Sequence, residues 1–222
     1  MTNENDNSRT LQSYQDKTQE YIKGTPSIDD TIKDWLNESL KLIPKDGKIL
    51  EVGSGFGRDA EYIRDKGFDI ECSDAVPNFV ELLQKKGFKT HTLDLLNDEV
   101  DGTYDMVLAD AVLLHFTPEE SESVTLKVHK ALNPGGIFAL RMKQGDGPVW
   151  TEEKLGEPRY FYYWQPKDLK KMLEDCGFEW LGMTKSFTGH NKASWIHIIV
   201  RKKQAYGLQA YYKQLNHKSK VI

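Results

Sequence analysis

Residues 49–63, ILEVGSGFGRDAEYI, decide the fold, because an apolar run gives way there to a glycine-rich turn and then to a helical pattern. Gly53, Gly55 and Gly57 have no side chains and lie where the expected strand leads into the helix, so the backbone there can adopt unusual dihedral angles and approach a ligand closely. The N-terminus of the following helix attracts negative charge. The stretch therefore predicts a ligand site at the carboxyl end of a strand.

The composition predicts one globular domain. The chain has 222 residues and a mass of 25.5 kDa, with 38% apolar and 29% charged residues. A net charge of −4 and a pI of about 5.9 argue against a protein that is basic overall and binds nucleic acid through that charge. Cys72 and Cys176 lie far apart and lack metal-ligand spacing, which fits a reduced, cytoplasmic protein. The polar N-terminus and the lack of a run of about 20 apolar residues predict neither a secretory signal nor a membrane span.

Strand-like and helix-like segments alternate along the chain. We expect strands at 48–52, 68–73, 89–93, 104–109, 137–142, 178–185 and 194–203. We expect helices at 27–42, 58–66, 77–86, 118–132 and 166–177, a mobile segment at 1–12 and a turn at 133–136. Ser27 is placed to cap the first of these helices, and Thr117 with Glu120 forms a capping box around Pro118.

This alternation predicts an α/β fold with a mostly parallel sheet and helices on both faces. The last two strands have no helix between them and should pair antiparallel at one edge. In open sheets of this kind, ligands bind beyond the carboxyl ends of the strands.

Acids end four successive strands of that sheet. Glu51 lies inside the first strand, where an acid is costly without a donor to meet. Asp74 ends the second strand, a position that accepts from ribose hydroxyls in nucleotide-binding sheets. Asp94 ends the third beside Leu95, where it could accept from an adenine amine, and Asp110 ends the fourth. Because unpaired like charges repel, a ligand that donates hydrogen bonds to these four acids would explain why they lie side by side along the carboxyl edge.

The glycine loop differs from the dinucleotide fingerprint G-x-G-x-x-G, because its third glycine comes one residue early and Arg58 takes the usual place. Taken together, the E-x-G-x-G-x-G loop, Asp74, Asp94, the stretch YDMVLADAVLLHF (104–116) and LNPGG (132–136) resemble the class I S-adenosylmethionine-dependent methyltransferases. The resemblance covers about residues 11–202. GSGFGRDAEYIRDKGFDI and LLHF are similar to the small-molecule, tellurite-resistance-type branch of that superfamily.

The resemblance implies a Rossmann-like, doubly wound, seven-stranded sheet of order 3-2-1-4-5-7-6, with the last strand antiparallel. It also implies a methyltransferase domain at 13–202 whose N-terminal helical segment, 13–45, folds over the cofactor as a lid. A basic tail, 203–222, would follow the domain. The alternative for the N-terminal segment is a simple docking helix.

The resemblance further implies a cofactor, S-adenosylmethionine, with S-adenosylhomocysteine as its product and no metal. Glu51 would lie near the methionine amine, Asp74 would bind the ribose hydroxyls, and Asp94 the adenine amine. The implied cofactor-binding residues are Tyr21, Glu51, Gly53, Ser54, Gly55, Arg58, Asp74, Ala75, Asp94, Leu95, Asp110 and Ala111. The sequence AVPN after Asp74 and the bulky Phe56 depart from the family pattern.

A sulfonium methyl is already activated, so such an enzyme mainly aligns the incoming nucleophile for in-line displacement, an effect worth roughly 7–11 kcal/mol in well-aligned cases. A general base helps only if the nucleophile must lose a proton. The candidate catalytic residues are His115, Asp110 and Lys143. The alternative for His115 is a side chain that braces its loop, and the alternative for Arg58 is a solvated arginine rather than a ligand contact.

Aromatic and basic residues mark the expected acceptor site. Tyr14 and Tyr21 share a helical face, and residues 141–164 combine aromatic side chains with a few cations, which suits a flat or anionic acceptor. The candidate substrate-binding residues are Tyr14, Arg141, Arg159, Tyr160 and Tyr162. In the alternative interpretation, alternate members of RYFYYW (159–164) pack a strand against the sheet.

The function that follows is methyl transfer to a small-molecule acceptor by a monomer or homodimer with no membrane partner. Three alternatives remain open. The acceptor could be RNA or protein, bound through the basic tail, although the acidic net charge disfavours nucleic acid. The chain could bind S-adenosylmethionine without catalysis, or it could be a nicotinamide-dependent oxidoreductase, which the loop spacing disfavours. The sequence ADAVLL after the fourth strand lacks the asparagine-proline-proline-aromatic motif, which favours O-, S-, C- or other N-methylation.

Overall fold

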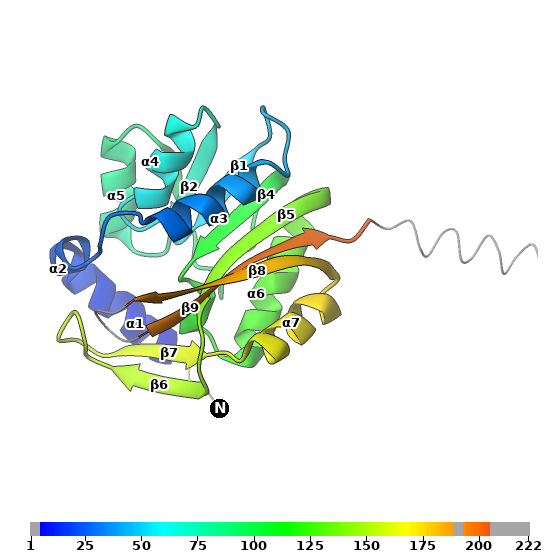
Figure 1. Cartoon of the computed structure of the whole chain (residues 1–222). Coiled ribbons are helices and arrows are strands. Elements are labelled where there is room, and N and C mark those ends of the chain that lie inside the picture. The colour runs from blue at the N-terminus through cyan, green and yellow to red at the C-terminus, as the bar shows by residue number, and fades with distance from the viewer. Residues whose placement is uncertain (1–4, 189–192, 205–222) are drawn as a thin grey trace, which may run out of the picture.

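The computed structural model describes residues 5–188 and 193–204. Seven strands form one sheet in the order β3-β2-β1-β4-β5-β9-β8 (Figure 1). Their bounds are β1 (Ile49–Val52), β2 (Ile70–Asp74), β3 (Lys89–Thr92), β4 (Tyr104–Asp110), β5 (Leu132–Lys143), β8 (Phe178–Thr188) and β9 (Ala193–Lys202). The neighbours from β3 to β5 pair in parallel, and β9 pairs antiparallel with both β5 and β8. This confirms the expected order and the antiparallel last strand, once the separate β6–β7 hairpin is left out of the count.

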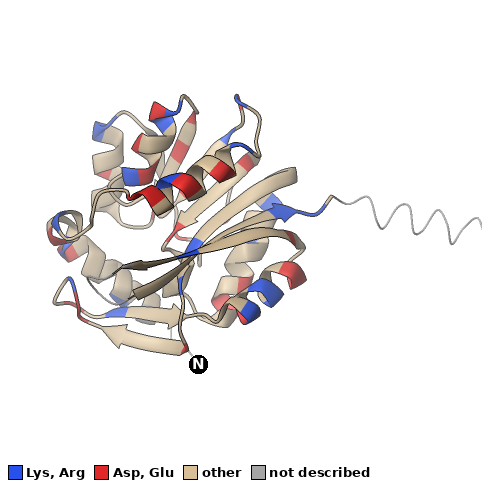
Figure 2. Ribbon diagram, viewed as in Figure 1, with Lys and Arg blue, Asp and Glu red and all other residues tan. Residues whose placement is uncertain are grey.

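Helices cover both faces of the sheet (Figure 1). One apolar cluster joins the sheet to α3 (Asp30–Leu40), α4 (Arg58–Asp65) and α5 (Pro77–Lys85), and the other joins it to α6 (Pro118–Ala131) and α7 (Pro166–Asp175). Strand β4 serves both clusters, with Met106 and Leu108 on one side and Val107 and Ala109 on the other. Charged residues gather on the helices, and the central strands are mostly uncharged (Figure 2). No helix within the described ranges is long and apolar enough to cross a membrane.

Helix α1 (Asn5–Asp16) begins within the segment 1–12 that the sequence predicts to be mobile, and α2 (Thr18–Lys23) follows it. Thr10 Oγ1 accepts from the backbone N–H of Tyr160 at 3.0 Å, and Ser13 Oγ donates to the Pro158 carbonyl oxygen at 2.7 Å. Short polar side chains thus attach α1 to a strand far away in sequence, which composition alone does not reveal. The expected basic tail lies outside the described residues from 205 onward.

Two helix starts show how capping sets element bounds. The first expected helix begins at Asp30 rather than near Ser27, because the Asp29 carboxylate accepts from the Ile32 N–H at 2.9 Å. The capping box of α6 is confirmed, since Thr117 Oγ1 accepts from the Glu120 N–H at 3.2 Å and the Glu120 carboxylate accepts from the Thr117 N–H at 2.8 Å. This cap fixes α6 directly after the short 3-10 helix η1 (Leu113–His115).

Residues 147–163 form a hairpin that the sequence did not predict. Strand β6 (Gly147–Thr151) pairs antiparallel with β7 (Arg159–Tyr163) in a two-stranded sheet of its own. Phe161 and Trp164 of RYFYYW still belong to the apolar cluster of the main sheet, and Tyr162 and Tyr163 pack against it, but the expected strict alternation is absent. Arg159, Tyr160 and Phe161 are consecutively buried, because α1 lies against β7 as well. The expected turn at 133–136 is part of β5, which begins at Leu132.

A buried ion-pair cluster joins the carboxyl edge of the sheet to α4. Asp110 ends β4 and lies beside Arg141 on β5, and Arg58 begins α4. The Asp110 carboxylate accepts from Arg58 Nη2 at 2.6 Å and from Arg141 Nε, while Arg58 also forms a bidentate pair with Asp59 at 2.8 and 2.9 Å. The side chains of Asp110, Arg58 and Arg141 are only 5%, 14% and 10% exposed. Burial alone would raise the pKa of Asp110, but the charges of Arg141 and Arg58 lower it to about 2.

Replacing Asp110 by Asn should destabilise the protein by about 3–5 kcal/mol at neutral pH, because Arg141 is left buried without a carboxylate. The stabilising contribution of Asp110 is present above its ordinary pKa of 3.8 and is lost as the pH falls towards 2. The difference between the wild type and Asp110→Asn should therefore shrink below about pH 4. Urea unfolding across this pH range measures it. In the double variant Asp110→Leu/Arg141→Met both partners are gone, so the loss should be smaller; a single-variant loss under about 1 kcal/mol would contradict the role of the cluster.

Replacing Thr117 by Ala should lower the free energy of unfolding by about 1 kcal/mol, because the first turn of α6 loses its side-chain acceptor. Thr117→Ser keeps the hydroxyl and should retain most of the stability. Urea unfolding of the two variants compares them directly, and equal losses would show that the methyl group of Thr117 matters rather than its oxygen.

Candidate active site

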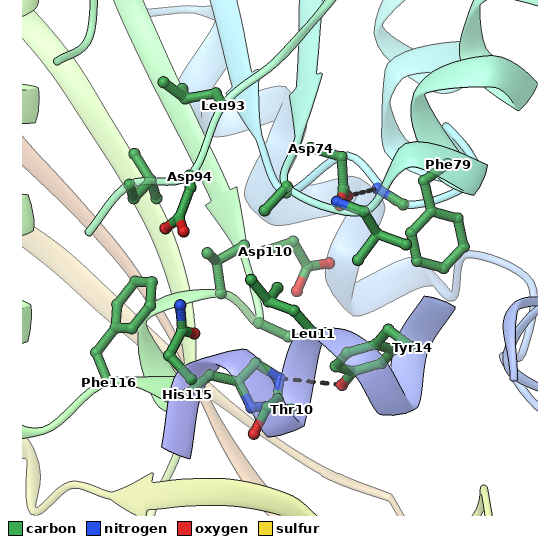
Figure 3. Close-up of a pocket in the computed structure, with 18 of the residues that line it drawn as sticks. Thr10, Leu11, Tyr14, Asp74, Phe79, Leu93, Asp94, Asp110, His115 and Phe116 are labelled. Carbon is green, nitrogen blue, oxygen red and sulfur yellow. Dashed lines mark hydrogen bonds between the residues drawn. The ribbon is translucent and has the colours of Figure 1, made fainter. Parts of the chain in front are cut away.

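One cavity opens at the carboxyl edge of the sheet, with α1 and α2 on its far side (Figure 3). It holds about 690 Å³ of empty space, part of it open to solvent. The glycine loop, the ends of β2, β3 and β4, α5 and η1 complete its walls. The lining residues are Asn7, Thr10, Leu11, Tyr14, Tyr21, Gly53, Gly55, Asp74, Ala75, Val76, Phe79, Leu93, Asp94, Leu95, Asp110, Ala111, Val112, His115 and Phe116.

The glycine loop has a backbone that side chains would obstruct. Gly53 and Gly57 have φ values of +64° and +85°. A Cβ at Gly53 would lie 2.4 Å from Val112 Cγ2, and one at Gly57 would lie 2.8 Å from Leu83 Cδ2. Both the left-handed conformation and the close packing therefore require glycine at these positions. The loop reaches the cavity through Gly53 and Gly55.

Asp74 connects the glycine loop to the end of β2. Its Oδ2 accepts from the Gly55 N–H at 2.8 Å, and its Oδ1 accepts from the Val76 N–H at 2.9 Å (Figure 3). Burial raises the pKa of Asp74 to about 6, although the backbone hydrogen bonds act in the opposite direction. A carboxylate has about four acceptor positions, so Asp74 keeps acceptor capacity beyond its bonds to Gly55 and Val76.

Asp94 and its neighbours form a second carboxylate site at the end of β3. The Asp94 carboxylate accepts from the Leu96 N–H at 3.0 Å and from Asn97 Nδ2 at 2.8 Å, which fixes the turn. Its oxygens face the cavity in Figure 3. Leu93 and Leu95 are 6% and 4% exposed and supply apolar surface beside it. This wall offers a hydrogen-bond acceptor next to a surface for a flat ring.

Glu51 lies below the loop and is 2% exposed. Its Oε2 has no hydrogen-bond partner among the described residues. Burial, followed by the charge of Asp59, raises the pKa of Glu51 well above its usual range. A buried carboxyl oxygen without a hydrogen-bond partner is costly.

Tyr14 and His115 form a hydrogen-bonded pair across the cavity wall. His115 Nδ1 lies 2.7 Å from the Tyr160 carbonyl oxygen, which can only accept, so Nδ1 carries the proton. Nε2 is then the acceptor for the Tyr14 hydroxyl at 3.0 Å (Figure 3). Arg159 Nη1 donates to the same hydroxyl at 3.2 Å. Burial lowers the pKa of His115 to about 3, so the imidazole is neutral at physiological pH.

The structure brings together most of the residues that the sequence singled out. Tyr14, Tyr21, Gly53, Gly55, Asp74, Ala75, Asp94, Leu95, Asp110, Ala111 and His115 all line the cavity. Those that do not line it are Glu51, Ser54, Arg58, Arg141, Lys143, Arg159, Tyr160 and Tyr162. The solvated arginine expected as the alternative for Arg58 is wrong, because this side chain is buried in ion pairs with Asp59 and Asp110. The loop-bracing alternative for His115 matches its two hydrogen bonds.

Sequence reasoning missed part of the wall, notably Asn7, Thr10 and Leu11 on α1. With Tyr14, these residues have the i, i+3, i+4, i+7 spacing of one helix face. That spacing could have identified the helix, but the polar side chains of Asn7 and Thr10 hid it from an apolar pattern. Phe79 and Phe116 complete the wall and carried no signal of their own.

Known proteins resemble this chain over most of its described length. A family model described as a methyltransferase domain matches residues 26–181, more than half of the chain. The methyltransferase nsrG of Aspergillus novofumigatus is 29% identical over 126 residues, covering 53% of this chain and 48% of that protein. The chain spans about half the length of the first curated relatives it matches, 48% and 50%.

Two solved structures share the fold at low sequence identity. The 1,6-didemethyltoxoflavin-N1-methyltransferase of Burkholderia thailandensis, with bound 1,6-didemethyltoxoflavin and S-adenosylhomocysteine, has a TM-score of 0.69 at 17% identity and covers 89% of this chain and 87% of its own. The CcbJ methyltransferase of Streptomyces caelestis has a TM-score of 0.68 at 15% identity and covers 89% and 99%. With a seven-stranded sheet of the expected order and a family model matched over residues 26–181, the chain belongs to the methyltransferase domain family.

Proposed function

We propose that this chain transfers a methyl group from S-adenosylmethionine to a small-molecule acceptor by in-line displacement, mainly by positioning the two reactants. The observation that carries the proposal is Asp74, a buried carboxylate at the end of β2 that the N–H groups of Gly55 and Val76 hold facing the cavity. The cofactor, when bound, supplies a methyl group that its sulfonium already activates.

The residues present fit such a cofactor. Asp74 has acceptor capacity left for the ribose hydroxyls, and Asp94 with Leu93 and Leu95 offers an acceptor and apolar surface to adenine. The backbone of Gly53 and Gly55 can approach the methionine part. The Glu51 Oε2 atom, buried and without a partner among the described residues, suits an ammonium donor. Tyr21 lies over the loop from α2, its ring edge-on to Phe79 at 5.5 Å.

Asp110 and His115, at the carboxyl edge of the sheet, differ in how well each could act as a general base. Both oxygens of Asp110 accept from arginines and its pKa is about 2, so we assign it the role of an anchor rather than a proton acceptor. His115 is neutral, and its Nε2 accepts from Tyr14. It therefore orients the Tyr14 hydroxyl, which lines the cavity where an acceptor would approach. The expected tellurite-resistance-type branch and the lid role of α1 and α2 stay predictions.

A small-molecule acceptor is supported by the cavity between the carboxyl edge of the sheet and the helices α1 and α2, and by the aromatic rings of Tyr14 and Tyr21, whose centroids are 5.1 Å apart. The Burkholderia thailandensis neighbour, which contains 1,6-didemethyltoxoflavin, shows that a protein of this fold accommodates a small acceptor. Nothing within the described residues favours RNA or protein over a small molecule.

Calorimetric titration with S-adenosylhomocysteine tests the proposal. The wild type should bind with a dissociation constant near micromolar, about −8 kcal/mol. Asp74→Asn should weaken binding at least tenfold, because hydrogen bonds to a charged acceptor contribute about 1.5–3 kcal/mol. Asp34→Asn, which removes an exposed carboxylate on α3, is the matched control and should bind like the wild type. If the folded, cofactor-free wild type does not bind, the proposed function fails. Tight binding without turnover over a broad acceptor panel would favour a binding protein without catalysis.

His115 should stay neutral, with its proton on Nδ1, between about pH 5 and 8, since burial lowers its pKa to about 3. Its contribution to stability is present above its ordinary pKa of 6.5 and is lost as the pH falls towards 3. Nitrogen NMR of histidine-labelled protein measures the tautomer, and Tyr14→Phe should shift the Nε2 resonance by removing its donor. A His115 titration midpoint between pH 6 and 7 in the wild type would contradict the neutral positioning role.

A further inference from the structure

Lys143 and Arg159, next to the candidate active site, have no carboxylate partner among the described residues. Lys143 ends β5 and Arg159 begins β7, and both lie against the ring of Phe161. The ring centroid is 4.5 Å from Lys143 Nζ and 5.2 Å from Arg159 Cζ. Arg58 and Arg141 differ from these two cations, because both of them pair with Asp110.

Arg159 is almost fully buried, with 5% of its surface exposed. Its Nη1 donates to the Tyr14 hydroxyl and its Nη2 to the backbone carbonyl of Glu153, both of them uncharged acceptors. Its Nε has no partner among the described residues, and no carboxylate in the described ranges lies within ion-pair distance of its guanidinium. A buried guanidinium without an anion is unusual, because burying an uncompensated charge is costly.

Lys143 is half-buried among aromatic rings. Its Nζ lies 4.5 Å from the ring centroid of Phe161, 5.3 Å from Tyr163 and 5.5 Å from Trp195. No hydrogen bond or ion pair joins Nζ to any described residue. Burial, followed by the charge of Arg159, lowers the pKa of Lys143 to about 8. The rings stabilise the ammonium in part, but the neighbouring guanidinium repels it.

We infer that Lys143 and Arg159 together bind an anionic group, a carboxylate or a phosphate, that belongs to the methyl acceptor. The inference rests on the proposed function for the identity of the ligand as an acceptor. An anion between the two cations would satisfy Arg159 Nε, give Lys143 its missing hydrogen-bond acceptor and cancel their repulsion. The rings of Phe161, Tyr163 and Trp195 would then surround an apolar or aromatic body attached to that anion.

The placement of the pair favours the acceptor over the cofactor as the source of the anion. Neither residue lines the cavity that contains Asp74 and Asp94. Arg159 is linked to that cavity through Tyr14, which both lines it and accepts from Arg159. The anion would therefore lie on the hairpin side of Tyr14, and the acids proposed for the nucleoside lie on the other side. The cofactor also carries a carboxylate, so the test must separate the two sources.

The other charged groups that face Lys143 define how binding depends on pH. Arg159 and Arg141 lower the pKa of Lys143 and Glu153 raises it. His115 also lies close enough to respond to Lys143, but it is neutral. Lys143 carries its charge below about pH 8, so the site should hold an anion below that pH and release it above. A bound anion should in turn raise the Lys143 pKa by favouring the charged form.

Carbon NMR of lysine-labelled protein saturated with S-adenosylhomocysteine tests the inference, with benzoate and inorganic phosphate as probes at constant ionic strength. At least one probe should raise the Lys143 titration midpoint by one pH unit or more. Lys143→Met and Arg159→Met should each weaken probe binding at least tenfold by calorimetry. Arg159→Lys keeps the charge and should retain part of it. Lys185→Met removes an exposed lysine on β8 and is the matched control, expected to bind like the wild type.

Three outcomes would overturn the inference: no midpoint shift with either probe, an equal loss of binding in Lys185→Met, or binding that persists unchanged in folded Lys143→Met. Replacing S-adenosylhomocysteine by 5′-methylthioadenosine, which lacks the amino acid part, identifies the source of the anion. If the probe binds with methylthioadenosine but is displaced by S-adenosylhomocysteine, the site takes the cofactor's own carboxylate and the acceptor assignment is wrong. If S-adenosylhomocysteine itself fails to bind while the probe still binds, the proposed function fails and the anion site stands.

Discussion

The carboxylate of Asp110, held between Arg58 and Arg141, is the interaction on which the carboxyl edge of the sheet depends. Each of its oxygens accepts from a different guanidinium, and each guanidinium comes from a different element. Because all three side chains are nearly excluded from water, the attraction is strong and a misplaced partner is costly. The pairs therefore fix the ends of β4 and β5 relative to the first turn of α4. Because the glycine loop leads directly into that turn, the ion pairs also fix the position of the loop.

Around this anchor, the two sides of Tyr14 differ in charge. Asp74 and Asp94 line the cavity on one side, with Glu51 buried below the glycine loop. Arg159 at the start of β7 lies next to Tyr14, and Arg159 and Lys143 at the end of β5 both lie against the ring of Phe161. In the proposed methyl transfer the sulfonium already activates the methyl group, so the residues around it would act mainly by aligning the two reactants. A tyrosine hydroxyl fixed by a neutral histidine and by an arginine marks the boundary between the two sides.

The sequence predicted what local patterns and chain order determine. Apolar strand patterns, glycines at the ends of elements and the capping box at Thr117 located most helices and strands. The acids at the strand ends located the cavity, because parallel strands bring their carboxyl ends together. Partners distant in sequence were out of reach. The sequence around Arg58 does not indicate that it pairs with Asp110, 52 residues away. The sequence around Thr10 does not indicate its hydrogen bond to the backbone of β7. RYFYYW shows why periodicity failed for the hairpin: α1 covers one face of β7 as the rest of the fold covers the other, so consecutive residues are buried.

The attachment of α1 to β7 has a consequence for the order in which the molecule assembles during synthesis. Thr10 and Ser13 bond to backbone groups that lie 150 and 145 residues later in the chain. The helix leaves the ribosome first, yet the strand that holds it is made only after most of the sheet. Closing so long a loop costs entropy that only late contacts repay. The cavity wall that α1 provides can therefore be attached only after β7 has been made, when the parallel strands β1 to β5 have already been synthesised.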